Sequence, residues 1–106
     1  MQLLTKEIRR KLPPLYSTEG KDLREVMAWV KFFTPDSSWT WYAAEFDGKD
    51  TFWGMVIGIA KEFGPFSLCE LQSIRGKLGL PVERDRFFKP TSLAELDEKN
   101  ADPMFY

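Results

Sequence analysis

The sequence contains no histidine and a single cysteine. Without histidine the chain has no imidazole that could act as a general base, and most zinc sites are excluded as well. Cys69 has no second cysteine for an internal disulfide and no histidine to activate its thiol. We therefore predict no metal site, no cofactor and no catalytic residues, and we expect a non-enzymatic protein of the reducing cytoplasm.

The sequence also lacks an excess of positive or negative charge, and it has no long apolar run. The net charge is −1, from 15 basic and 16 acidic residues, and this balance argues against a general affinity for nucleic acid. No apolar run approaches the ~20 residues of a membrane span, and the charged N-terminal residues do not resemble a signal peptide. We therefore expect no membrane partner.

What the chain has in quantity is apolar and aromatic residues, at 43% and 15%. This composition supplies one hydrophobic core, so we predict a single globular domain over residues 1–106. We expect the acidic tail, residues 97–106, to fray or to dock through its apolar end.

The aromatic residues gather in three runs, residues 26–33, 39–46 and 51–63, which contain all four tryptophans. Aromatic and β-branched residues favour strands, whereas the sequences at 34–38 and 47–50 are typical of turns. Residues 21–33 also fit a helix behind Asp22, but we predict a strand for their second half. Gly64-Pro65 predicts a further turn after the third run. The pattern indicates consecutive antiparallel hairpins.

Alternation within the runs indicates how the sheet is covered. Trp39 and Trp41 share one face of an extended strand, and Tyr42, Ala44 and Phe46 share the other. Both faces are therefore partly apolar, which predicts helices over one face and a loop or a partner over the other. In the third run small residues at 54, 58 and 60 leave space for a tryptophan or tyrosine of a neighbouring strand.

Capping signals place the helices. Thr5 begins a helix over residues 5–12, and the boxes Ser67 to Glu70 and Ser92 to Glu95 begin a helix over 68–78 and a short final helix. Residues 80–90, bounded by prolines, predict a short edge strand. The predicted fold class is α+β, with an antiparallel sheet of three to five strands, on which the N-terminal helix and the helix after the meander pack.

One pattern imitates a nuclease signature. Pro35-Asp36 and Asp47-Gly48-Lys49 have the spacing of acids that share a metal ion in such enzymes. The intervening strand would separate the two carboxylates by roughly 30 Å, because a strand rises about 3.3 Å per residue. We therefore predict that Asp36 and Asp47 share no metal.

Motifs over nearly the whole chain resemble a known family. They are LLT at 3–5, KLPPLYST at 11–18, VKFFTPD at 30–36, WTWY at 39–42, LGLP at 78–81 and ERD at 83–85. With these motifs the chain resembles family 2958 of the domains of unknown function. The resemblance implies a small bacterial protein carried on plasmids, conjugative elements and phage-like islands, without an established activity or catalytic residues.

Two functions remain open. The first is an interaction protein of a mobile genetic element, which binds and inhibits a host defence component or assists conjugation. Its partner would be a host or element-encoded protein, bound through the residues Trp39, Trp41, Tyr42, Asp36 and Arg84. The three aromatics could equally all belong to the core.

The alternative function is a nucleic-acid-binding or nucleic-acid-processing module. The aromatic residues of the sheet would then stack on bases, while Arg9, Arg10 and Lys31 would follow the phosphates.

Overall fold

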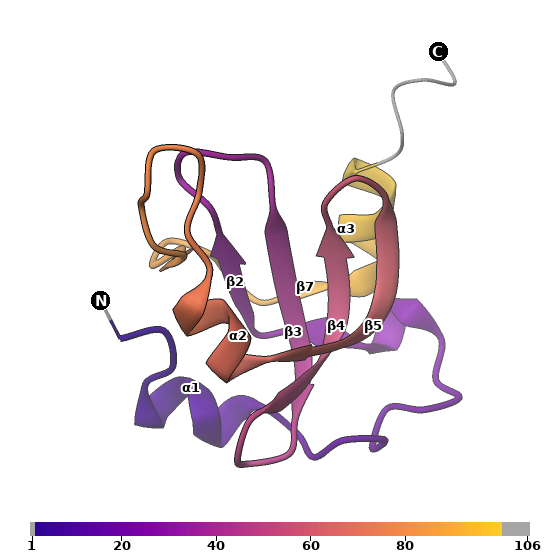
Figure 1. Ribbon diagram of the computed structural model, residues 1–106. Coiled ribbons are helices and arrows are strands. Elements are labelled where there is room, and N and C mark those ends of the chain that lie inside the picture. The colour runs from indigo at the N-terminus through magenta and orange to yellow at the C-terminus, as the bar shows by residue number, and fades with distance from the viewer. Residues whose placement is uncertain (1, 101–106) are drawn as a thin grey trace.

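The computed structural model describes residues 2–100, and its architecture is α+β (Figure 1). Five antiparallel strands form the main sheet in the order β5-β4-β3-β2-β6, so the long strand β3 is central. These strands are β2 (Val30–Phe33), β3 (Thr40–Phe46), β4 (Thr51–Ile57), β5 (Lys61–Ser67) and β6 (Glu83–Arg84). The predicted fold class is confirmed, and the edge strand predicted within residues 80–90 is β6.

The remaining elements cover the two faces of the sheet. The helices are α1 (Lys6–Lys11), the 3-10 helix η1 (Leu23–Glu25), α2 (Leu68–Ser73) and α3 (Leu93–Lys99). The short strands β1 (Met27–Ala28) and β7 (Thr91–Ser92) pair with each other in a second, two-stranded sheet.

Two hydrophobic cores lie on opposite faces of the sheet. On one face α1 and α2 pack over Phe32, Trp41 and Phe52, as expected for the first two helices. On the other face α3 and η1 pack over Tyr42 and Met55. Both faces are thus covered by helices of the chain itself, and the second cover is η1 and α3 rather than a loop or a partner (Figure 1).

The predicted caps are present. The hydroxyl oxygens of Thr5, Ser67 and Ser92 each accept a hydrogen bond, at 3.2 Å, from the backbone N–H three residues later. Asp47 Oδ1 accepts from three successive N–H groups, of residues 49, 50 and 51, and these bonds hold the pKa of the Asp47 carboxyl below its ordinary value. Local hydrogen-bonding chemistry therefore places the helix starts and this turn.

The third run forms two strands, not one, so the prediction of a single strand over 51–63 is wrong. The chain turns at residues 58–60, where Gly58 N–H donates to the Ala60 carbonyl at 3.1 Å, and it returns as β5. Gly64-Pro65 lies inside β5 and makes no turn. Because β5 is an edge strand, Pro65 is tolerated there although it lacks an N–H.

The second helix is shorter than predicted. It ends at Ser73, and Ile74 has an extended backbone, whereas the sequence pattern extended the helix to residue 78. The carboxylate of Asp36 accepts hydrogen bonds from the N–H groups of Leu78 and Leu80, at 2.7 and 3.2 Å. These long-range bonds replace the helical ones, and Leu78 is exposed instead of joining the apolar stripe.

A β-bulge in the central strand changes the face of the sheet on which the residues after Ala43 lie. The register between β3 and β4 shifts between Ala43 and Glu45, so one extra residue stands in β3. As a result Phe46 lies on the same face as Trp41, not on the face of Tyr42 as simple alternation predicted.

Neighbouring atoms occupy the space at two glycines of the third run, a tryptophan ring at Gly58 as predicted and backbone instead of a side chain at Gly54. The ring of Trp39 lies where a Cβ of Gly58 would be, and the backbone carbonyl of Tyr42 lies where a Cβ of Gly54 would be. Glycine is required at position 54, because the backbone of β3 could not yield to a Cβ without moving the strand, whereas at position 58 a Cβ would displace the Trp39 ring.

The described end of the chain is helical. Residues 97–99, which we assigned to a frayed or docked tail, belong to α3, and residues 101–106 of that tail lie outside the described part. In residues 2–100 no helix has the length and apolar character required to cross a bilayer.

Gly54→Ala is expected to lower the free energy of unfolding by at least about 2 kcal/mol, because the new Cβ overlaps the Tyr42 carbonyl. The matched control is Gly64→Ala, since Gly64 pairs with Gly54 but has nothing within 4 Å of its Cβ position. The control should change stability by less than about 0.5 kcal/mol. Urea denaturation measures both, and equal losses would contradict the described register.

Candidate functional site

An open groove lies at the surface where we predicted, from the sequence, that a partner protein binds. It has a volume of about 490 Å³ and lies between the turn at 34–38, the C-terminal end of α2 and the start of β3. Its lining residues are Thr34, Ser37, Trp39, Trp41, Glu70, Ile74, Arg75, Gly76 and Lys77. Segments from three parts of the chain therefore meet here.

Two tryptophans form one side of the groove. The rings of Trp39 and Trp41 are stacked, with centroids 5.9 Å apart and planes at 24°. Trp41 is only 5% exposed and belongs to the core, whereas Trp39 is 38% exposed. Since Trp39 also packs against Trp41 and Gly58, it presents a fixed apolar surface to the groove.

The loop after α2 is held beside the groove by Asp36. The hydrogen bonds from Leu78 and Leu80 end on Oδ2, and Oδ1 is buried without a hydrogen-bond partner in the described part of the chain. Asp36 therefore joins the 34–38 turn to the 76–80 loop, and the two segments lie side by side in Figure 1.

This anchored loop exposes apolar side chains. Leu78 is 81% exposed and Leu80 44% exposed, and they follow Gly76 and Lys77, which line the groove. The charged residues Glu70, Lys77 and Arg75 line the groove with Trp39, and the Arg75 guanidinium donates to the carbonyls of Gln72 and Ile74 at 3.1 and 2.9 Å. An apolar centre with a charged rim is the usual arrangement of a protein interface.

Two other predicted interface residues lie elsewhere. Tyr42 is buried on the opposite face, 5.7 Å from the Phe88 ring, and burial raises the pKa of its phenol above the ordinary value. Arg84 lies on β6 opposite Phe32, and its guanidinium donates to the backbone carbonyl of Gln2. The structure therefore brings together Trp39, Trp41 and Asp36, but not Tyr42 and Arg84.

The three predicted phosphate-binding residues are dispersed. Arg9 lies over the Phe46 ring at 5.3 Å, at the end of β3 away from Trp39, and Arg10 is exposed on α1. Lys31 points to the other face, where its ammonium lies 3.8 Å from the Asp85 carboxylate and 5.9 Å from the Tyr42 ring centroid. They do not surround the tryptophan pair.

The acids of the nuclease-like pattern are also separate. Asp36 lies before β3 and bonds to the 76–80 loop, whereas Asp47 follows β3 and bonds within its own turn. In the described part of the chain, no three cysteine or acidic side chains are grouped as metal ligands.

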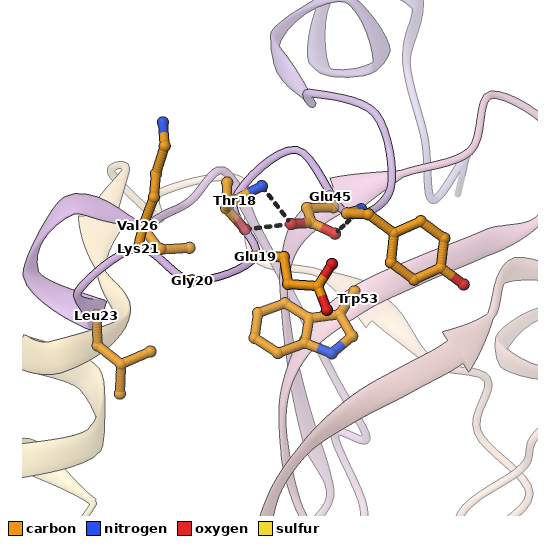
Figure 2. A pocket seen from close by; sticks show the side chains of 9 residues that line it. Thr18, Glu19, Gly20, Lys21, Leu23, Val26, Glu45 and Trp53 are labelled. Carbon is orange, nitrogen blue, oxygen red and sulfur yellow. Dashed lines mark hydrogen bonds between the residues drawn. The ribbon is translucent and has the colours of Figure 1, made fainter.

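A second pocket, which was not predicted from the sequence, lies on the opposite face of the sheet (Figure 2). Glu45 is buried beside it and accepts from the N–H groups of Tyr16 and Thr18, at 2.8 and 3.0 Å, and from the Thr18 hydroxyl. A lone carboxylate in the otherwise uncharged run 39–46 was the available signal, because a buried charge requires nearby donors.

The comparison with known families assigns the chain. Residues 3–100 match the family described as protein of unknown function DUF2958. The chain belongs to this family, as the motifs suggested. No curated protein and no solved structure matches it.

Glu45→Gln is expected to lower the free energy of unfolding by about 2 kcal/mol, because an amide cannot accept from all three donors of residues 16 and 18. Glu62→Gln removes a carboxylate from an exposed position of β5 and should have no measurable effect. Thermal and urea denaturation measure the difference. A Glu45→Gln variant as stable as the parent would show that these bonds do not hold the loop.

Proposed function

We propose that this chain is a non-enzymatic interaction protein that binds another protein through the Trp39–Trp41 groove. The observation that carries the proposal is the exposure of Trp39 in a groove of about 490 Å³, with the exposed Leu78 and Leu80 in the loop that continues from the lining residues Gly76 and Lys77. Aromatic residues at the centre of such a surface commonly supply most of the binding energy.

The rigidity of the surface supports this function. Asp36 fixes the loop that carries Leu78 and Leu80, and the stacked ring of Trp41 fixes Trp39. Because this surface is already ordered, binding would cost it little conformational entropy. A small entropic cost favours tight binding.

The biological setting belongs to the same proposal. The resemblance implies a mobile genetic element, so the partner would be a host defence component that is inhibited, or a component of conjugation. The protein would act in the cytoplasm, where the exposed free thiol of Cys69 stays reduced.

A second candidate function, nucleic-acid binding, is favoured by a different groove. It has about 330 Å³ between α1 and residues 84–90, and Lys11, Arg84, Arg86 and Trp29 line it. Basic side chains near an aromatic ring are typical of single-strand binding. Glu7 and Asp85 share the lining, which weakens the positive potential.

Leu78→Ser is expected to reduce partner capture from host lysate at least about tenfold while the melting temperature stays unchanged, because this side chain is 81% exposed. Trp39→Ala should weaken binding by about 2 kcal/mol or more. The matched control is Phe87→Ser, since Phe87 is also an exposed apolar residue, at 89%, but lies outside the 76–80 loop. Immobilised full-length protein and quantitative mass spectrometry provide the measurement.

The same capture, with and without nuclease treatment of the lysate, separates the two functions. Nuclease-resistant capture that Leu78→Ser removes and Phe87→Ser preserves would support the protein partner. Nuclease-sensitive capture that Arg86→Glu removes would support nucleic acid instead. Equal capture by the Trp39→Ala, Leu78→Ser and Phe87→Ser variants would exclude the groove as the binding surface.

A further inference from the structure

The second pocket is a separate cavity with an aromatic wall. It has a volume of about 270 Å³ and is lined by Trp53, by Leu23 and Val26, and by Tyr16 and residues 18–21 of the preceding loop with Glu45. Trp53, Val26 and Leu23 belong to the core of α3 and η1, so this pocket and the Trp39–Trp41 groove lie on opposite faces of the sheet.

The loop wall of the pocket is fixed without a ligand. Tyr16 has a φ of 69°, and it is the one non-glycine residue of the described chain with a positive φ. Side chains disfavour this conformation, so surrounding bonds must impose it. The Glu45 carboxylate does so, because it accepts from the N–H of Tyr16 and from both the N–H and the hydroxyl of Thr18 (Figure 2).

The aromatic wall is equally well supported. The Trp53 indole stacks on the Phe63 ring, with centroids 6.3 Å apart and planes at 22°. Trp53 is half-buried, and its indole lines the cavity together with the aliphatic side chains of Leu23 and Val26. A ligand group here would contact an indole and two aliphatic side chains.

The charge at the pocket is negative. Glu19 lines it with Glu45, and in the described part of the chain the Glu19 carboxylate makes no ion pair. Lys21 also lines the pocket, but its ammonium points away from Trp53, whereas Glu19 extends toward the indole (Figure 2). A carboxylate beside an indole is suited to a cation, because the ring face and the carboxylate attract the same charge.

We infer that this pocket binds the positively charged side chain of an arginine or lysine presented by a partner protein. The aliphatic part of such a side chain would pack on Leu23 and Val26, and its charged end would meet Glu19 and the Trp53 ring. A small inorganic cation would leave the aliphatic part of the cavity unfilled. The site is independent of the Trp39–Trp41 groove, so either site can fail a test without affecting the other.

The probe for the test is Nα-acetyl-arginine amide, and Nα-acetyl-citrulline amide is its uncharged analogue of nearly the same shape. The side-chain N–H resonance of Trp53 is followed by NMR in the full-length protein. We expect a saturable shift with the arginine probe, a similar shift with Nα-acetyl-lysine amide, and none with citrulline. Glu19→Gln should weaken arginine binding by about tenfold, because it removes a charged hydrogen-bond acceptor, whereas Glu62→Gln on β5 should leave it unchanged.

An equal shift with citrulline would overturn the inference, and so would unchanged arginine binding in the Glu19→Gln variant. Absence of any Trp53 shift up to the solubility limit of all three probes would also overturn it. Glu19 is exposed, so its substitution should leave the fold intact, which the melting temperature checks. The Leu78→Ser variant should bind the arginine probe normally.

Discussion

The buried carboxylate of Glu45 in the central strand is the constraint on which much of this structure depends. A charge that is 3% exposed must be met by hydrogen-bond donors, and the donors come from Tyr16 and Thr18, almost thirty residues earlier in the chain. This requirement fixes the loop between α1 and η1 against the sheet. It also fixes the left-handed backbone at Tyr16.

The bulge in the same strand distributes side chains between the two faces. By adding one residue between Ala43 and Glu45, it turns Phe46 to the face of Trp41 and lets Glu45 lie beside Trp53 on the other. One face then carries the groove at Trp39, and the other carries the pocket at Trp53. A groove and a pocket thus arise on opposite sides of one strand.

Local features could be read from the sequence. The caps at Thr5, Ser67 and Ser92 and the turn at Asp47 depend on residues three or four positions apart, and each appears as expected. Close packing at Gly58 was also predictable, because the alternation of small residues left room for a large side chain. The meander and the α+β class follow from these features.

Non-local features could not be predicted in the same way. The end of α2 depends on Asp36, some forty residues earlier, and the loop that it holds carries the exposed Leu78. The position of Arg84 depends on pairing of β6 with β2, and the face of Phe46 on the bulge. Within the candidate site, Trp39, Trp41 and Asp36 were found from sequence, whereas the 76–80 loop and the Glu45 pocket required tertiary contacts.

Amide hydrogen exchange tests most directly whether the buried carboxylate of Glu45 holds the surface loop in place. The N–H groups of Tyr16 and Thr18 bond to Glu45, whereas the neighbouring Gly20 N–H makes no hydrogen bond within the described residues. We predict that the first two exchange at least about a hundredfold more slowly than the third, relative to their intrinsic rates. Exchange of Tyr16 and Thr18 as fast as that of Gly20 would contradict the account.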